Sequence, residues 1–184
     1  MKKNIPLFID LDGTLIKEDL SHRAFFYFFK TKPMVCLFHI LIFLFLGRPY
    51  LKEKISKNFI VNISNLKKNI SCIEYIKKHK KNNRMIYLIS GSHQLLVNQI
   101  NNQLNLFNNV FGTYKNFNMI GKNKIFYINN KLGIFDFDYI GNSKQDLPIW
   151  NYTQKVIYTN ASSSLKKKLK KLNFEVIEIK EKFL

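Results

Sequence analysis

Short apolar runs that end at a polar residue or a glycine alternate along this chain with segments of helical periodicity. Runs of this kind, bounded by turn-forming residues, are typical of buried strands. They lie at residues 5–10, 84–89, 109–113, 137–141, 155–159 and 174–179. Strands that alternate with helices form a parallel sheet joined by right-handed crossovers. The pattern therefore predicts an α/β fold of three layers, with helices on both faces of a parallel sheet.

One helical stretch is much longer than the others. Over residues 18–81 apolar positions recur three to four apart, with lysines between them, as in amphipathic helices. This is too long for a simple crossover, so we expect a helical cap at 18–81, inserted after the first strand and standing over the strand ends. The core would then be residues 1–17 and 82–184. Shorter helices are predicted at 93–104, capped by Ser92, at 124–132, closed by Gly133, and at 162–172.

The most apolar part of the cap is residues 34–46, which are apolar apart from His39. A helix needs about twenty residues to cross a bilayer, and lysines and Pro33 separate this run from the phenylalanine-rich run 24–30. We expect two short apolar helices that are buried against each other. The alternative is an element that lies in or dips into a membrane surface.

The net charge of +18, from thirty basic and twelve acidic residues, raises the question of an anionic partner. Only three of the thirty are arginine, although arginine is the side chain that reads guanine edges and forks onto phosphate. Lysine, asparagine, isoleucine and phenylalanine are abundant throughout, which indicates a chain-wide bias and not a local binding face. The composition therefore argues against nucleic acid as the main partner.

The two cysteines, Cys36 and Cys72, cannot form a framework of several disulfides and have no metal-ligand spacing with the four histidines. The start of the chain, MKKNIPLFID, has too few apolar residues for a secretory signal. We therefore expect a reduced, cytoplasmic setting, either in solution or peripheral to the membrane.

Polar residues follow three of the predicted strands, at the edge where ligands bind to open parallel sheets. They are Asp10 and Asp12 after the first strand, Ser90 and Gly91 after the second, and Asn142 and Asp146 after the strand 137–141. Lys124 opens the helix that leads into that last strand. Acids, a hydroxyl, backbone amides and an ammonium are thus predicted to share one rim.

Four short motifs match, in order and spacing, the motifs of the haloacid dehalogenase-like (HAD) hydrolase superfamily. They are DLDGT at 10–14, LIS ending at Ser90, GKNK containing Lys124, and GNSKQD at 141–146. The cap also lies where that superfamily places a helical cap of the first type. The chain therefore resembles HAD hydrolases over nearly its whole length, which implies a Rossmann-like core and a phosphatase activity.

The resemblance assigns a role to each residue at the rim. Asp10 would be the nucleophile that forms an aspartyl-phosphate, and Asp12 would protonate the leaving oxygen and then activate water. Ser90, the amide of Gly91 and Lys124 would hold the phosphoryl oxygens. Lys122 is an alternative for this last role. Lys124 is preferred because Lys124 stands at the start of the apolar helix. In the cap, the polar residues available to a substrate head group are His22, Arg23 and Arg48.

Mg²⁺ is the implied cofactor, because a carboxylate cannot approach a dianionic phosphate without a cation and Mg²⁺ suits oxygen ligands. The implied ligands are Asp10, Asp12 through its main-chain carbonyl, Asn142 and Asp146. The fourth motif often begins with glycine and aspartate, whereas this chain has Asn142 in second place. An amide carries one negative charge less than a carboxylate, so magnesium affinity should fall unless Asp146 compensates.

Four longer stretches of the sequence resemble one particular group of HAD domains. DLDGTLIKEDL, LKEKIS, FDYIGNSKQDLPIW and VIYTNAS look like the HAD domain fused ahead of UbiA-type prenyltransferase membrane domains. This likeness implies a prenyl-linked phosphate or a phosphosugar as substrate. It also implies a free-standing relative, or the soluble half of a split system whose partner is a separate prenyltransferase. Two alternatives stay open: a mutase or phosphotransferase with the same site, and a non-catalytic module that docks on a membrane prenyltransferase.

Overall fold

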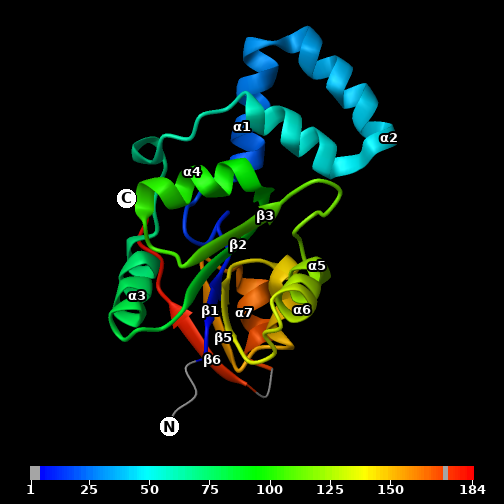
Figure 1. Ribbon diagram of the computed structural model, residues 1–184. Helices are drawn as coiled ribbons and strands as arrows, with labels where there is room; N and C mark the ends of the chain where they lie inside the picture. The colour runs from blue at the N-terminus through cyan, green and yellow to red at the C-terminus, as the bar shows by residue number, and fades with distance from the viewer. Residues whose placement is uncertain (1–4, 172–173) are drawn as a thin grey trace.

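The structure, a computed structural model, describes residues 5–171 and 174–184, and is built on a six-stranded parallel sheet (Figure 1). The strand order is β3-β2-β1-β4-β5-β6. The strands are β1 (Leu7–Ile9), β2 (Ile86–His93), β3 (Asn109–Thr113), β4 (Asp138–Gly141), β5 (Lys155–Thr159) and β6 (Glu175–Ile179). The predicted parallel sheet is confirmed. Its central strand β1 pairs in parallel with β2 on one side and with β4 on the other, so the carboxyl ends of these three strands are neighbours.

Helices cover both faces of the sheet. Side chains alternate between the two faces along each strand, and the strands carry apolar side chains on both, so each face packs against helices. Leu7 and Ile9 of β1 belong to the core that includes α3 (Ile70–Lys81) and α4 (Gln94–Leu104). Phe8 belongs to the opposite core, formed with α5 (Lys122–Phe126), α6 (Leu147–Trp150) and α7 (Ser163–Leu169). The three-layer α/β prediction is therefore confirmed.

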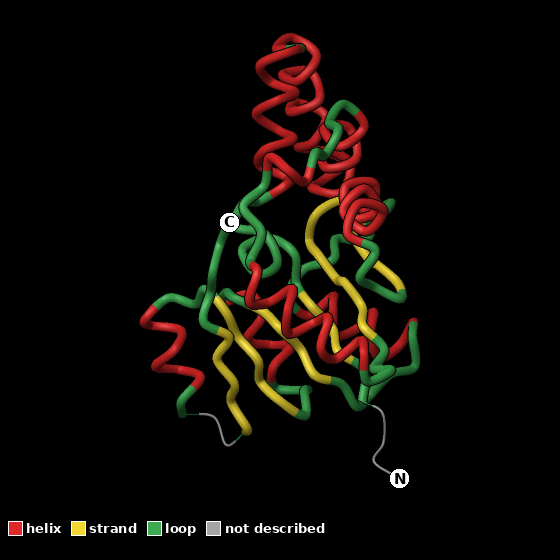
Figure 2. The backbone as a smooth tube through the Cα atoms, turned by 90° about the vertical axis from the view of Figure 1, so that its left-hand side faces the viewer, coloured by secondary structure: helices red, strands yellow, loops and turns green. Residues whose placement is uncertain are grey.

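A helical hairpin stands above the carboxyl ends of the strands (Figures 1 and 2). It consists of α1 (Leu20–Thr31) and α2 (Pro33–Lys57), and a 3-10 turn, Ile63–Asn65, follows it. The predicted cap of 18–81 also included α3, which instead lies beside the sheet, with Cys72 and Ile76 fully buried in the core. The part that projects is thus shorter than predicted, because α3 has an apolar stripe of its own that the sheet covers.

The prediction that residues 34–46 would be buried is wrong for one face of α2. Cys36 is fully buried, but Met34, Leu41 and Phe45 are exposed. Among the described residues α2 is the one helix long and apolar enough to cross a membrane by length and composition, and only 6% of its most apolar stretch is buried. Gly47, with a φ of 75°, interrupts the helical backbone. Two short helices do not offer enough surface to bury so many apolar side chains.

The ends of three predicted elements differ in the structure. Strand β2 runs on to His93, whose side chain accepts from the N–H of Leu95 and caps α4, so the predicted cap Ser92 lies within the strand. Helix α5 begins at Lys122, two residues before the predicted start, and continues as a π-helical turn, Tyr127–Lys131. The helix predicted at 162–172 ends at Leu169, and position 172 lies outside the described residues.

Candidate active site

All the predicted rim residues except Ser90, which is fully buried, line a cavity of about 580 Å³ between the strand ends and the hairpin. Asp10 follows β1 directly, and its N–H donates to the carbonyl of Ile140, so the sheet fixes its backbone. Ser90 lies in β2, and Asp146 ends the 3-10 turn after β4 (Lys144–Asp146). Because β1 lies between β2 and β4, these residues converge although they are far apart in sequence.

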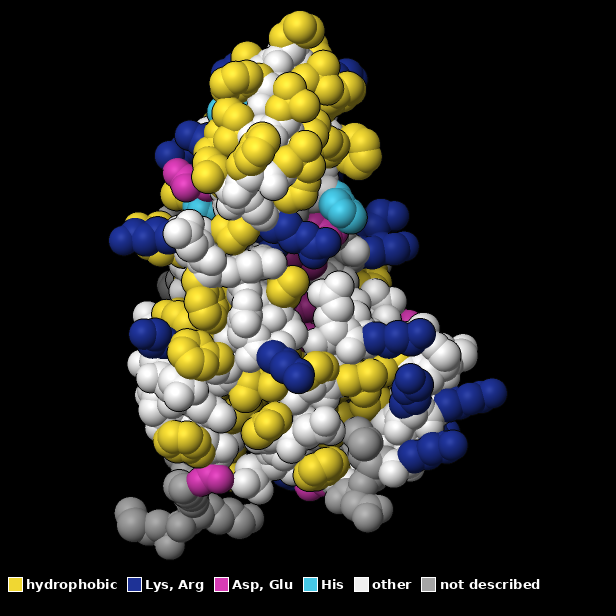
Figure 3. Space-filling view, turned by 90° about the vertical axis from the view of Figure 1, so that its right-hand side faces the viewer, with side chains coloured by type: hydrophobic (Ala, Val, Ile, Leu, Met, Phe, Trp, Pro, Cys, Tyr) yellow, Lys and Arg dark blue, Asp and Glu magenta, His cyan; other side chains and the backbone are white. Residues whose placement is uncertain are grey.

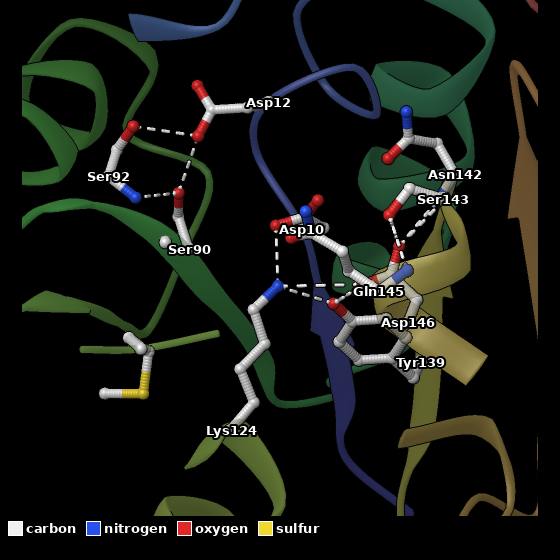
Figure 4. A network of polar contacts seen from close by, with 12 residues as sticks. Asp10, Asp12, Ser90, Ser92, Lys124, Tyr139, Asn142, Ser143, Gln145 and Asp146 are labelled. Atoms are coloured by element: carbon white, nitrogen blue, oxygen red, sulfur yellow. Dashed lines mark hydrogen bonds and ion pairs between the residues drawn. The ribbon is translucent and has the colours of Figure 1, made fainter. Parts of the chain in front are cut away.

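A buried lysine links two of the carboxylates (Figure 4). Lys124 Nζ donates to Asp10 Oδ1 at 2.7 Å and to the Tyr139 hydroxyl at 2.7 Å, and lies 3.8 Å from Asp146 Oδ1. Tyr139 in turn donates to Asp146 Oδ1 at 2.7 Å. Lys124 is buried whereas Lys122 is exposed, so the structure brings Lys124 to the site and leaves Lys122 outside it.

Asp146 is held from its other side by its own turn. Its Oδ2 accepts from the N–H groups of Asn142 and Ser143 and from the Ser143 hydroxyl. Ser143 and Asp146 form a reciprocal capping box. Gly141 makes room for this arrangement, since a Cβ there would lie 2.7 Å from the Asp146 carboxyl. The position of the Asp146 carboxyl group at the rim is therefore fixed.

Asp12 makes a separate network on the side of β2 (Figure 4). Its Oδ2 accepts from the hydroxyls of Ser90 at 2.9 Å and Ser92 at 2.8 Å. Its Oδ1 accepts from the N–H of Leu20, the first residue of α1, at 2.8 Å. The Ser90 hydroxyl also accepts from the N–H of Ser92. Asp12 thus joins the strand end to the start of the hairpin, and the predicted phosphate ligand Ser90 here binds a carboxylate.

The buried carboxyl groups have altered proton affinities. Burial raises the pKa of Asp10 to about 7, with Lys124 acting in the opposite direction and the neighbouring carboxylates adding to the rise. Burial also raises the pKa of Asp12, as does the charge of Asp19, while the hydrogen bonds to its carboxylate lower it. Although burial lowers the pKa of Lys124, the charges of Asp10 and Asp146 more than offset this and leave that pKa raised. The raised pKa favours the charged form of Lys124.

The predicted metal ligands are oxygen-bearing groups of the kind that Mg²⁺ prefers. Asp10, Asp146 and Asn142 line the cavity, and Asp10 Oδ2 receives no hydrogen bond from any residue in 5–171 or 174–184. Within those ranges no group of three or more His, Cys, Asp or Glu side chains is placed to hold a metal. Two carboxylates, an amide and a carbonyl suit Mg²⁺, which keeps several waters. The Asp12 side chain is not counted among these ligands, because it is hydrogen-bonded to Ser90 and Ser92. The predicted ligand atom of Asp12 is its main-chain carbonyl oxygen.

The hairpin supplies the other wall of the cavity. His22, Phe25, Phe43, Arg48 and Lys52 line it, whereas Arg23 instead donates to the carbonyl of Asn65 outside it. Lys52 Nζ donates to the carbonyl of the predicted phosphate ligand Gly91 at 2.6 Å and to Asn118 Oδ1 at 2.9 Å. Cations and aromatic rings therefore face the carboxylates across the cavity.

Three residues at the site were missed by sequence reasoning. Ser92 had a signal, because residues two apart in a strand point to one face, as Ser90 and Ser92 do. Tyr139 had a weaker signal, since a tyrosine in a buried strand needs a partner for its hydroxyl. Lys52 had none, because it is one of many lysines and only the fold of the hairpin selects it.

No family model matches this chain. Among curated proteins it is 29% identical over 174 residues, 95% of its length, to the uncharacterised protein y4nM of Sinorhizobium fredii. The chain spans 33% of the length of that relative.

Several solved structures are similar over nearly the whole chain. A protein of unknown function from Bordetella pertussis Tohama I has a TM-score of 0.68 at 12% identity, covering 95% of this chain and 98% of that one. A HAD family hydrolase from Salmonella enterica serovar Typhi has a TM-score of 0.64 at 13% identity, covering 97% and 68%. A phosphoserine phosphatase, as a phospho-aspartyl intermediate analogue, has a TM-score of 0.58 at 18% identity, covering 98% and 95%. The chain therefore has the fold of the HAD-superfamily hydrolases.

The hydrogen bond from Ser92 to Asp12 generates a prediction about proton affinity. A donor to a carboxylate stabilises its charged form and lowers its pKa, and a hydrogen bond to a charged group contributes about 1.5–3 kcal/mol. Replacing Ser92 with Ala should raise the pKa of Asp12 by about one unit, measured by ¹³C NMR titration of labelled aspartate in magnesium-free buffer. Ser21→Ala is the control, because the Ser21 hydroxyl contacts Ser92 at 3.2 Å but not Asp12. An unchanged pKa in Ser92→Ala would contradict this assignment.

Proposed function

We propose that this protein is a magnesium-dependent phosphatase that hydrolyses phosphomonoesters through an aspartyl-phosphate on Asp10. The observation that carries the proposal is the convergence of Asp10, Asp12, Lys124 and Asp146 on one cavity, at the carboxyl ends of three adjacent strands. The fold shared with HAD hydrolases supports the same reaction class.

In the first step Asp10 Oδ2 attacks phosphorus, and the bond from phosphorus to the ester oxygen breaks. Asp12 gives its proton to the leaving oxygen. Its raised pKa suits this role, because a general acid must hold its proton near the working pH. Lys124 holds Asp10 Oδ1 by a 2.7 Å hydrogen bond, which orients the other oxygen toward the cavity.

In the second step Asp12, now ionised, takes a proton from a water that attacks phosphorus, and the bond to Asp10 breaks. The hydroxyls of Ser90 and Ser92 stabilise the ionised Asp12 between the two steps. Mg²⁺, held by Asp10, the carbonyl of Asp12, Asn142 and Asp146, would neutralise phosphate charge and favour the ionised form of Asp10.

The substrate class that we propose is a phosphate or phosphosugar on a prenyl-type apolar group. Phe25, Phe43, Leu51 and Ile55 line the hairpin side of the cavity, which suits an apolar leaving group. The motifs that look like those of HAD domains fused to UbiA-type prenyltransferases support the same class, and make a membrane prenyltransferase the partner we propose.

The activity is tested by the release of free phosphate from p-nitrophenyl phosphate, with Mg²⁺ and with a chelator. The wild-type protein should turn over many times with Mg²⁺ and lose activity without it. Asp10→Asn should lower kcat by about a thousandfold or more, because it removes the nucleophile. Asp136→Asn is the matched control, because Asp136 precedes β4 at the opposite end of the sheet. Equal activity in wild type and Asp10→Asn would overturn the proposal, and substoichiometric phosphate would favour a phosphotransferase.

The neutral Asn142 generates a separate prediction about magnesium. Asn142→Asp adds a negative charge beside Asp10 and Asp146, so Mg²⁺ should bind about tenfold or more tightly, as measured by calorimetry. Without magnesium the same variant should have a lower Tm, because the added carboxylate repels its neighbours. Asn82→Asp, an exposed change after α3 at the far end of β2, should alter neither value. Unchanged magnesium affinity in Asn142→Asp would show that position 142 does not reach the metal.

A further inference from the structure

We propose that the α1–α2 hairpin docks on an anionic lipid bilayer, with the outer face of α2 inserted among the lipids. The first observation is the exposure of apolar side chains at helical spacing. Met34, Phe38, Leu41 and Phe45 recur at i, i+4, i+7 and i+11, and are 77%, 58%, 63% and 87% exposed. This spacing places them on one face of the helix.

The stripe is part of a larger apolar surface on the hairpin. Figure 3 shows hydrophobic side chains gathered over the hairpin, with Lys and Arg side chains below and beside them. Other exposed apolar residues of the hairpin are Phe26, Tyr27, Phe29, Val35, Leu37, Leu44 and Leu46. The inner face of α2 is already occupied by contacts within the hairpin and the core, as buried Cys36 shows. The outer face is left uncovered by residues 5–171 and 174–184, and so needs a cover from elsewhere.

The arrangement of charge around this surface, and not its amount, favours an anionic bilayer as the cover, because basic residues are abundant along the whole chain. No Asp, Glu, Lys or Arg lies between Pro33 and Gly47, whereas Lys30, Lys32 and Arg48 flank this segment. Over residues 20–57 there are seven basic residues and one acidic residue. Lysine is depleted at protein–protein interfaces, but lysine and arginine beside an apolar helical face are typical of helices that bind anionic lipids.

The geometry favours a helix that lies in the interface over one that crosses the bilayer. The helical backbone of α2 is interrupted at Gly47, so the straight apolar part covers residues 33–46. Such a helix is about 21 Å long, shorter than the hydrocarbon core of about 30 Å. His39, the one ionisable side chain other than Cys36 in that part, is bonded through Nδ1 to the Tyr50 hydroxyl at 2.7 Å. Its polar atom is thus satisfied within the hairpin.

The test is flotation with vesicles of phosphatidylcholine alone or mixed with phosphatidylglycerol. The wild-type protein should float with the mixed vesicles, and added salt or loss of the anionic lipid should weaken binding. Leu41→Ser combined with Phe45→Ser should lower the partition coefficient about tenfold or more. Phe135→Ser combined with Tyr152→Ser is the matched control, since these residues are 70% and 57% exposed and lie outside the hairpin. The control should float as the wild type does.

A second measurement separates insertion from surface attraction. In Phe45→Trp, the tryptophan emission should shift to shorter wavelength with mixed vesicles and be quenched by brominated lipid, while native Trp150 is buried. Equal flotation of the Leu41/Phe45 double variant and its control would overturn the proposal. It would also be overturned by a lipid-free dimer that this double variant converts to a monomer, without any vesicle binding, since the cover would then be a second copy. Flotation does not depend on turnover, so its outcome is independent of the phosphatase proposal.

Discussion

The candidate site depends on the interaction of the Lys124 ammonium with the carboxyl groups of Asp10 and Asp146. Lys124 belongs to α5, and its ammonium lies among Asp10 at the end of β1, Tyr139 in β4 and Asp146 in the turn after β4. Three carboxyl groups in a buried site repel one another, and their ionised forms are costly without compensating charge. One lysine compensates only part of this charge. The proposed Mg²⁺ would compensate the rest and would also neutralise charge on the phosphate that approaches Asp10.

The two halves of the site have different environments, which fits their proposed roles. Asp10 is paired with Lys124, which acts toward the ionised form needed by a nucleophile, while burial and the neighbouring carboxylates leave the pKa of Asp10 raised to about 7. Asp12 is in contact with no cation of the described part of the chain and accepts from two hydroxyls and an amide, and burial leaves its pKa raised. Burial thus raises the pKa of both carboxyl groups, and their surroundings differ in the cation that contacts Asp10. The hydrogen bond from the N–H of Leu20 also ties Asp12 to the hairpin, so the position of the hairpin and the orientation of the acid are coupled.

The sheet and the rim could be predicted from sequence because their signals are local. A buried strand that ends in DLDGT specifies its own turn, and the order of strands and helices specifies a parallel sheet. The extent of the cap could not be predicted, because α3 has the same periodicity and lysine content as the helices of the hairpin. The exposed face of α2 could not be predicted either, since an apolar helix reads the same whether protein or lipid covers it. Lys52 and Tyr139 are placed by contacts between distant segments, which no spacing in the sequence records.

Asp10 is proposed to carry the phosphoryl group during turnover. The most direct measurement is to quench the protein with acid while it turns over an aryl phosphate with Mg²⁺, digest it, and locate the added phosphoryl group by mass spectrometry. We expect the group on the peptide that contains Asp10, and none on that peptide in Asp10→Asn. A phosphoryl group on Ser90 or Ser92, or steady turnover with no labelled peptide at any quench time, would contradict it.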